Sequence, residues 1–257
     1  IRQSETYAKF MEKLGWRVEN IKCQITNDKL LVYIKEFPII GSFIKILRPN
    51  IIPTLRDLKV LKKYRPFKVQ IEPNTSNISK SVTSVTSVTR EYKKLGLKST
   101  DDPLIPSKTI LIDLKPPEEK IFSSFSEEKR RAVRRAIKNK IIISKSDNIE
   151  DFIKLKNQQL WPFGFLLTGE IKKLWKVFRP VNKAALLVAY LFTAKICQPV
   201  GGIFLLFHQK TVYYWLASAT REGKKLFAPS LLVWEAIKLG KKSGFETFDF
   251  EGIEDER

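Results

Sequence analysis

The sequence has very few of the residues that build metal centres and disulfide frameworks. One His and two Cys, Cys23 and Cys197, occur among its 257 residues. These three residues fall short of a zinc site of ordinary spacing, and two cysteines cannot form a disulfide framework. We therefore expect no metal and no cofactor. The low cysteine content is typical of a reduced, cytoplasmic compartment.

Long apolar runs and common catalytic signatures are also lacking. Runs such as residues 184–192 are much shorter than the roughly 20 residues that a membrane-spanning helix needs. The sequence begins at Ile1 without a signal-like segment, so we expect no targeting peptide. No Gly-x-Ser-x-Gly elbow, Walker loop or dinucleotide fingerprint occurs, which leaves no motif-based assignment to those enzyme classes.

Acidic residues are in short supply relative to basic ones. The chain has 47 Lys and Arg against 27 Asp and Glu, a formal net charge of +20. With 43% hydrophobic residues it can still build a substantial core, which excludes disorder over the whole chain. The charge favours a polyanionic partner: a nucleic acid, a nucleotide or an anionic membrane face.

The pattern of apolar residues and turn residues predicts two mixed α/β halves, residues 1–105 and 106–257. In the first half we expect helices at 6–14 and 54–64 and strands at 17–25, 29–37, 39–47 and 67–72. Residues 75–89 are rich in Ser, Thr and Val, and we interpret them as a mobile loop before a helix that ends near Gly96.

The second half is predicted to contain helices, a β-meander and a final helix–strand pair. We expect one helical stretch from about 116 to 139, further helices at 148–160, 170–178 and 230–243, and strands at 109–114, 141–144, 184–194, 199–207, 211–218 and 246–250.

The strongest local feature is the basic segment 129–140, KRRAVRRAIKNK, with seven cations in twelve residues and no acid. At about 100° per residue, Ala132, Val133, Ala136 and Ile137 share a packing face. The opposite face carries Arg130, Arg131, Arg134, Arg135 and Lys138. A solvated basic face is the ordinary interpretation of such a helix. The lack of interspersed Glu favours phosphate binding instead.

A strand–loop–helix arrangement follows in residues 213–230. Tyr214 and Ser218 lie on the predicted strand, and Gly223 lies in the loop before the next helix. Acyl-coenzyme A acetyltransferases hold pyrophosphate on backbone N–H groups at such a place. This loop has a single Gly, and Phe227 and Pro229 fit a phosphate cradle poorly, so the topology is a hint and the cofactor is unsupported.

Acidic residues end two of the predicted strands. Asp249 and Glu251 alternate with Phe248 and Phe250, so we expect both carboxylates on one strand face. Glu72 ends a strand in the first half. Each can serve as a base or hold a substrate amine, and each can equally be a solvent-facing acid.

Taken in order along the chain, several blocks resemble the FemABX family of aminoacyl-tRNA-dependent peptidyltransferases, which build peptidoglycan cross-bridges. The matching blocks cover nearly the whole chain. They are Tyr7-Ala8-Lys9, Leu14-Gly15-Trp16, Ile71-Glu72-Pro73, residues 109–114, the basic segment, Trp215-Leu216-Ala217-Ser218-Ala219, residues 228–234 and Asp249-Phe250-Glu251-Gly252-Ile253.

The resemblance implies two tandem GNAT-like acyltransferase subdomains with a cleft between them, and transfer of an amino acid from aminoacyl-tRNA to a stem-peptide amine. By this resemblance Glu72 and Asp249 are the catalytic acids. Lys9, Lys129, Arg130, Arg131, Arg134 and Arg135 are expected to bind the precursor's diphosphate, and Tyr214, Ser218 and Glu251 are further substrate-binding candidates.

The partners implied are aminoacyl-tRNA and a UDP-MurNAc-pentapeptide or lipid II precursor, with a peripheral contact at the inner membrane face and a monomeric state. Family members also carry a Phe-Lys pair shortly after the last block, whose lysine is implied to stabilise the oxyanion. The sequence ends at Arg257, before that position. Two alternatives stay open: an acyl-coenzyme A-dependent N-acyltransferase, and a non-catalytic protein that binds RNA or an anionic membrane.

Overall fold

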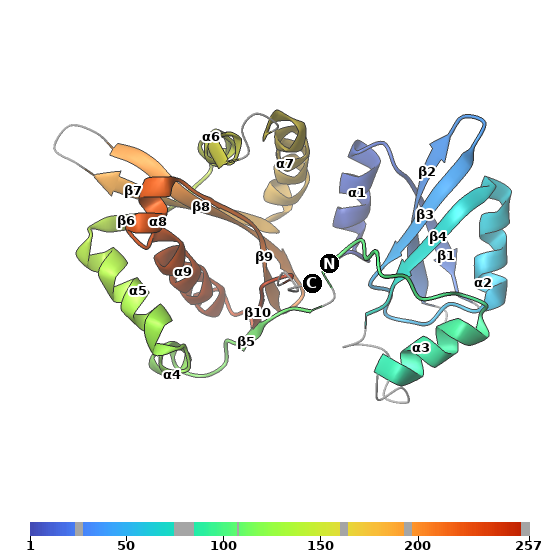
Figure 1. Ribbon diagram of the computed structural model, residues 1–257, viewed down its shortest axis with the longest axis horizontal. Coiled ribbons are helices and arrows are strands. Elements are labelled where there is room, and N and C mark those ends of the chain that lie inside the picture. The colour runs from blue at the N-terminus through green and yellow to red at the C-terminus, as the bar shows by residue number, and fades with distance from the viewer. Residues whose placement is uncertain (24–27, 75–84, 107, 160–163, 193–196, 253–257) are drawn as a thin grey trace. The chain divides into compact units, whose positions relative to one another are not determined.

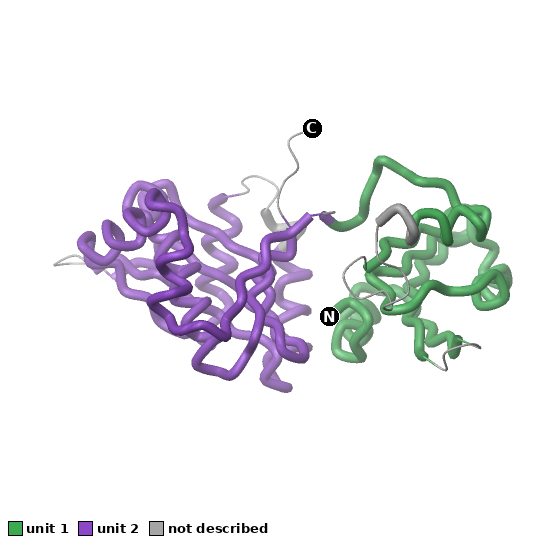
Figure 2. Tube along the Cα trace, turned by 90° about the horizontal axis from the view of Figure 1, so that it is seen from below, with its two compact units in different colours: residues 1–105 green, residues 106–257 purple. Residues whose placement is uncertain are grey.

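The computed structural model describes residues 1–252 except 24–27, 75–84, 107, 160–163 and 193–196. The chain divides into two compact units, Ile1–Ile105 and Pro106–Arg257 (Figure 2).

The first unit is built on a four-stranded sheet in the order β1-β2-β3-β4 (Figure 1). The strands are β1 (Arg17–Lys22), β2 (Lys29–Phe37), β3 (Gly41–Leu47) and β4 (Pro66–Glu72). Neighbouring strands are antiparallel except for β3 and β4, which are parallel. The connection between those two passes through α2 (Leu55–Lys59) and the 3₁₀ helix η1 (Val60–Tyr64).

Both faces of this sheet are covered, because β2 is apolar at consecutive positions. Leu30, Val32 and Ile34 join Leu61 of η1 in one cluster. Tyr33 points to the other face, where its ring lies 5.9 Å from that of Tyr7 on α1 (Glu5–Lys13). Alternation along a strand sends successive side chains to opposite faces, so the run Leu-Leu-Val-Tyr-Ile supplies both cores.

The helix α3 (Val85–Lys94) completes the first unit. Its Tyr92 packs against Ile52, Ile71 and Leu97. The loop predicted over 75–89 is wrong for its last part, because residues 85–89 belong to this helix. Residues 75–84 lie outside the described residues.

The second unit has a six-stranded sheet in the order β5-β10-β9-β8-β7-β6. Its strands are β5 (Leu111–Asp113), β6 (Ile141–Ser146), β7 (Ala184–Phe192), β8 (Cys197–His208), β9 (Thr211–Ala219) and β10 (Thr247–Asp249). Only β9 and β10 run parallel, and they pair over three residues, Thr247–Asp249 against Thr211, Val212 and Tyr213.

Helices cover both faces of this sheet, and β8 shows how (Figure 1). Ile203 and Leu205 belong to a core cluster with residues of α5 (Glu127–Lys138) and α9 (Ala228–Lys242). On the other face, the ring of Phe204 lies 6.2 Å from Phe152 of α6 (Ile149–Gln159) and 5.7 Å from Trp175 of α7 (Gly164–Phe178). The remaining short helices are α4 (Glu118–Ser123), η2 (Arg179–Val181) and α8 (Arg221–Lys225).

The single helix predicted from 116 to 139 is two helices, α4 and α5. The Ser124 hydroxyl donates to the Ile121 carbonyl at the end of α4, and the Ser126 hydroxyl accepts from the backbone N–H of Lys129 as the N-cap of α5. Serine side chains compete in this way for backbone groups and favour helix ends over helix interiors.

Within the described parts of the chain, no helix combines the length and the apolar character needed to cross a bilayer.

Candidate functional site

Glu72, the acid predicted at the end of the first half, is the last residue of β4 and is partly buried. Its Oε1 atom accepts hydrogen bonds from Gln70 Nε2 at 3.0 Å and from the backbone N–H of Leu104 at 2.8 Å. Gln70 lies two positions earlier on the same strand face, which explains how the two side chains meet. The carboxylate is therefore held in one orientation by a strand neighbour and by the chain that returns along β4.

Gln70 is 4% exposed and uses its amide in a specific way. Nε2 donates to Glu72 Oε1 and also, at 2.7 Å, to the carbonyl of Asp102. Because both partners are acceptors, the amide nitrogen must face them, and this fixes where the amide oxygen points. That oxygen, Gln70 Oε1, is buried and has no hydrogen-bond partner among the described residues.

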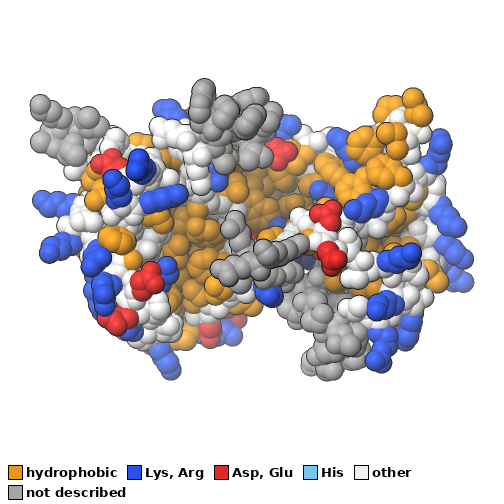
Figure 3. All heavy atoms as spheres, viewed as in Figure 1, with side chains coloured by type: hydrophobic (Ala, Val, Ile, Leu, Met, Phe, Trp, Pro, Cys, Tyr) orange, Lys and Arg blue, Asp and Glu red, His pale blue; other side chains and the backbone are white. Residues whose placement is uncertain are grey.

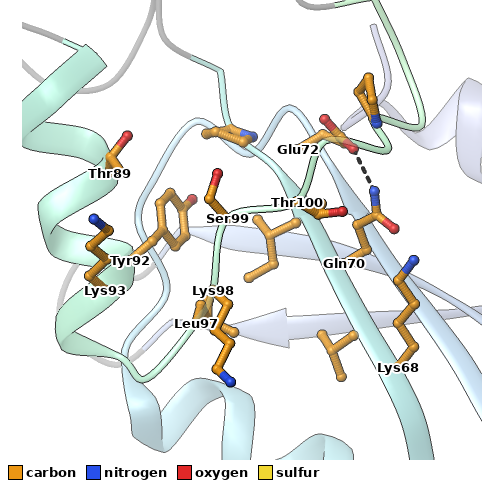
Figure 4. A pocket seen from close by; sticks show the side chains of 14 residues that line it. Lys68, Gln70, Glu72, Thr89, Tyr92, Lys93, Leu97, Lys98, Ser99 and Thr100 are labelled. Carbon is orange, nitrogen blue, oxygen red and sulfur yellow. Dashed lines mark hydrogen bonds between the residues drawn. The ribbon is translucent and has the colours of Figure 1, made fainter.

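A cavity of about 270 Å³ lies beside these groups (Figure 4). Figure 4 shows Gln70 and Glu72 on one side of it and Tyr92, from α3, on another. The Tyr92 hydroxyl is also buried without a partner in the described part of the chain, and the side chain is 9% exposed. Buried polar atoms in folded proteins are nearly always hydrogen-bonded, so Gln70 Oε1 and the Tyr92 hydroxyl are exceptions among the residues that line the cavity.

The cavity has a neutral phenol in its lining and cations at its rim. Burial raises the pKa of the Tyr92 phenol well above its usual range, so this hydroxyl stays neutral and can both donate and accept. Lys68, Lys93 and Lys98 bring exposed cations to the rim. Apolar side chains complete the lining, among them Ile71, Pro73, Leu97 and Pro103. The arrangement can accept hydrogen bonds from an amine and attract an anionic group beside it.

Asp249, the second predicted acid, is the last residue of β10 in the second unit and is 9% exposed. Its Oδ1 atom accepts from the Thr109 hydroxyl at 2.6 Å and from the backbone N–H of Glu251 at 2.8 Å. Glu251 lies beyond the strand with a φ of 63°. The prediction that strand alternation places both acids on one face is therefore wrong, because the strand ends before Glu251.

Tyr214 and Ser218 on β9 do lie at one place in the second unit. Both line a smaller cavity of about 160 Å³, together with Gln159, Lys224 and Pro229. The Ser218 hydroxyl donates to Gln159 Oε1 at 2.9 Å, and burial raises the pKa of Tyr214. This cavity lies along the part of β9 that extends past its short pairing with β10. The residues of β9 that follow Tyr213 do not pair with β10, and several of them line this cavity.

The basic segment forms most of α5 and the turn after it. Some of its cations have acidic partners and others do not. Ala132, Val133 and Ala136 are buried as predicted, but Ile137 is 59% exposed, so its place on the packing face is wrong. Arg131 forms an ion pair with Glu127, Lys129 lies 3.7 Å from Glu128, and Arg130 donates to the Ser123 carbonyl at 2.7 Å. The acids that precede the segment therefore occupy two of its cations.

The other exposed cations of this helix face are Arg134, Arg135 and Lys138. The guanidinium groups of Arg134 and Arg135 lie over the rings of Phe122 and Phe227, at 5.8 and 5.5 Å from the ring centres. Neither has an ion-pair partner within the described chain. Lys9 is exposed on α1 in the first unit.

Sequence reasoning missed Gln70, Tyr92 and Thr109. The period of two along β4 is a usable signal for Gln70, because it places this residue on the same face as Glu72. Tyr92 carries no such signal, since its position depends on how α3 packs against Ile71. Thr109 reaches Asp249 from a segment 140 residues earlier in the chain.

With this geometry in place, comparison with known proteins identifies the class. The sequence profile of the acetyltransferase (GNAT) domain family matches residues 123–257, more than half of the chain. The chain therefore belongs to this family, and we assign it as an acyltransferase. No curated protein sequence matches it.

Solved structures carry the fold assignment further. The crystal structure of FemX superposes with a TM-score of 0.78 at 14% identity, covering 100% of this chain and 84% of that chain. The structure of L-PGS from Bacillus licheniformis has a TM-score of 0.53 at 12% identity, covering 96% of this chain and 74% of the other.

A tandem GNAT protein from the clavulanic acid biosynthesis pathway has a TM-score of 0.53 at 8% identity, with coverage of 91% and 74%. These likenesses confirm the predicted FemABX-like α/β fold of two GNAT-like subdomains, each built on a sheet with both parallel and antiparallel strands.

The two unpartnered buried atoms, Gln70 Oε1 and the Tyr92 hydroxyl, generate a stability prediction. We expect Tyr92→Phe to leave the free energy of unfolding unchanged or to raise it by about 1 kcal/mol, because it removes a buried hydroxyl that has no partner. We expect Gln70→Leu to lower it by about 1–3 kcal/mol, because two hydrogen bonds are removed. Chemical denaturation of both variants checks this, and a clear destabilisation by Tyr92→Phe would contradict it.

Proposed function

We propose that the chain transfers an amino acid from aminoacyl-tRNA to a stem-peptide amine of a peptidoglycan precursor. The observation that carries the proposal is the cavity at the end of β4, where Gln70 and the backbone N–H of Leu104 hold the Glu72 carboxylate in one orientation. The FemX-like fold and the FemABX-like sequence blocks around Glu72 support the choice of reaction.

An acceptor amine suits the oriented carboxylate of this cavity. An ammonium group donates several hydrogen bonds, and the Glu72 carboxylate has acceptor sites beyond those that Gln70 and Leu104 use. Attack on an ester needs the neutral amine, so Glu72 is proposed to take one proton from it, directly or through water. The lysines at the rim suit an anionic group on the acceptor peptide.

The chemical step asks little of the protein beyond placement. The amine nitrogen forms a bond to the ester carbonyl carbon, and the carbon–oxygen bond to the tRNA ribose breaks. The ribose oxygen leaves with a proton as a hydroxyl. Because the ester is already activated, most of the rate enhancement would come from positioning and from stabilising the oxyanion.

The donor is proposed to lie along the second unit. The part of β9 that lies beyond its pairing with β10 includes Tyr214 and Ser218, and it lines a cavity. Arg134 and Arg135 are proposed to meet tRNA phosphates, because they are exposed on α5 while Arg131 and Lys129 already have acidic partners. Asp249 is proposed to position the β10 end through its contact with Thr109. Aminoacyl-tRNA places such a reaction in the cytoplasm.

Acyl-coenzyme A as donor is the second candidate, favoured by the match to the acetyltransferase family. The start of α9 argues against it. Phe227 occupies the N-cap position with a φ of 63° and makes no side-chain cap, and Pro229 follows two positions later, so one backbone N–H is absent from the first turn. This leaves the helix end poorly suited to cradle a pyrophosphate.

Glu72→Gln tests the role of the carboxylate. We expect kcat/KM for transfer to fall by at least about 100-fold, since general-base contributions are typically of that size, while the fold is kept. Glu91→Gln, on α3 of the same unit, is the matched control and should leave the rate unchanged. Transfer of labelled amino acid to a stem peptide gives the readout. Equal rates for Glu72→Gln and the original chain would contradict the proposal and favour a non-catalytic binding role.

Arg134 and Arg135 generate a prediction about tRNA binding. We expect affinity to fall steeply with salt, because neutralised phosphates release counterions. Replacing both arginines with Gln should reduce the slope of log K against log salt by about 0.7–0.9 for each phosphate that is no longer neutralised. Arg131→Gln, which removes a cation already paired with Glu127, should change the slope less. A slope that is the same in all three proteins would contradict a docking role for this face.

A further inference from the structure

The turn between β2 and β3 exposes apolar side chains at its tip. Ile39 is 97% exposed and Ile40 is 69% exposed. Phe37, before the turn, and Phe67, on β4, are also exposed, and their rings lie 5.9 Å apart. We call these four residues, Phe37, Ile39, Ile40 and Phe67, the apolar tip. Isolated exposed apolar residues are ordinary, but a group of four at one projecting turn marks an interaction surface.

The backbone at the tip is strained in a way that the fold does not require. The N–H of Ile40 donates to the carbonyl of Pro38 at 2.8 Å, and Ile39 between them has a φ of 74°. This is a γ-turn of the rare, strained type, and a β-branched residue is disfavoured at positive φ. Glycine or asparagine would fit better. Ile39 thus adds strain and exposes nearly its whole side chain without packing in return.

The tip is nevertheless held firmly from behind. The N–H of Ser42 donates to the Arg65 carbonyl at 3.1 Å, and the Ser42 hydroxyl donates to the Tyr64 carbonyl at 2.8 Å. Gly41 has a φ of 106°, and a Cβ there would lie 2.2 Å from the Arg65 carbonyl oxygen. These contacts fix the turn against the start of β4, so the apolar side chains are presented on a rigid support.

Cations lie beside the apolar tip. Lys63 and Arg65 line a cavity together with Phe37 and Ile39, and Lys68 follows Phe67 on β4. The nearby Glu36 is already paired with Arg17, at 3.0 Å. Figure 3 shows hydrophobic side chains gathered at the upper right, over the β2–β3 turn, with Lys and Arg side chains next to them. The local charge is therefore positive around an apolar centre.

We propose that the apolar tip inserts into the surface of an anionic phospholipid bilayer, with the surrounding cations at the headgroup phosphates. Apolar side chains enter the boundary between headgroups and acyl chains, while nearby Lys and Arg are attracted to the negative surface potential. The excess of cations around the tip favours this occupant over a protein partner. All residues of this surface belong to the first unit. Among those named here, Lys68 also lies at the rim of the cavity that Glu72 lines.

The full chain and vesicles provide the test. We expect sedimentation with phosphatidylcholine vesicles that contain about one third phosphatidylglycerol, little with phosphatidylcholine alone, and weaker binding as salt rises. Ile39→Gly should weaken vesicle binding by about tenfold or more, since it removes the inserted side chain. The same variant should have an unchanged or higher melting temperature, because glycine tolerates the positive φ. Its transfer rate on a soluble acceptor should be unchanged.

Matched variants separate the contributions. Ile142→Ser removes an exposed isoleucine from β6 of the second unit and should bind vesicles like the original chain. Lys63→Gln with Arg65→Gln should lower affinity for the anionic vesicles and flatten its salt dependence. Ile40→Ser serves as a second tip variant if Ile39→Gly changes the melting temperature unexpectedly.

Three results would overturn the proposal. The first is vesicle binding that survives both tip variants. The second is equal binding to neutral and anionic vesicles. The third is self-association in solution that Ile39→Gly abolishes without any vesicle binding, which would assign the apolar tip to protein contact.

Discussion

The amide of Gln70 is the interaction on which the candidate site depends. β4 is the last strand of the first sheet, and in the described chain no further strand pairs with its outer edge. The returning chain is bound to that edge through side chains instead, by Gln70 to the Asp102 carbonyl and by Glu72 to the N–H of Leu104. Because the amide nitrogen serves both Glu72 and Asp102, the amide oxygen is left without a hydrogen-bond partner among the described residues. One buried side chain thus binds the returning chain and orients an acid.

The second unit reaches a comparable result by a different route. β9 and β10 run parallel over only three residues, and Phe248 at the centre of that pairing is fully buried. Beyond it, β9 continues without β10, and Tyr214, Ser218 and the start of α9 enclose a cavity. The short parallel pairing thus holds Asp249 at the end of β10 and leaves the following residues of β9 unpaired on that side. The two units each place an acid at the end of a strand, although they differ in what holds it: a glutamine in one and a threonine in the other.

The sequence predicts much of the fold because its strongest patterns are local. The apolar run of β2 and the hairpin formed by the strands predicted at 199–207 and 211–218 follow from period and turn chemistry, and both occur where expected. The break between α4 and α5 escapes prediction, because helical periodicity continues across it and only serine capping ends α4. The β-propensity of Ile39 predicts a strand, whereas this residue is the centre of a strained turn. The position of Tyr92 cannot be predicted without the tertiary packing of α3. The ion pair between Arg131 and Glu127 depends on a residue that precedes the basic segment, so the segment alone does not show which of its cations are paired.

We propose that this acyltransferase takes its acyl group from tRNA and passes it to an amine held at Glu72. The most direct measurement supplies the protein with a stem peptide and, separately, with aminoacyl-tRNA and with acyl-coenzyme A, and follows the new amide bond by mass spectrometry. We expect the peptide to gain one aminoacyl group from aminoacyl-tRNA and nothing from acyl-coenzyme A. Acylation from coenzyme A alone would contradict the claim.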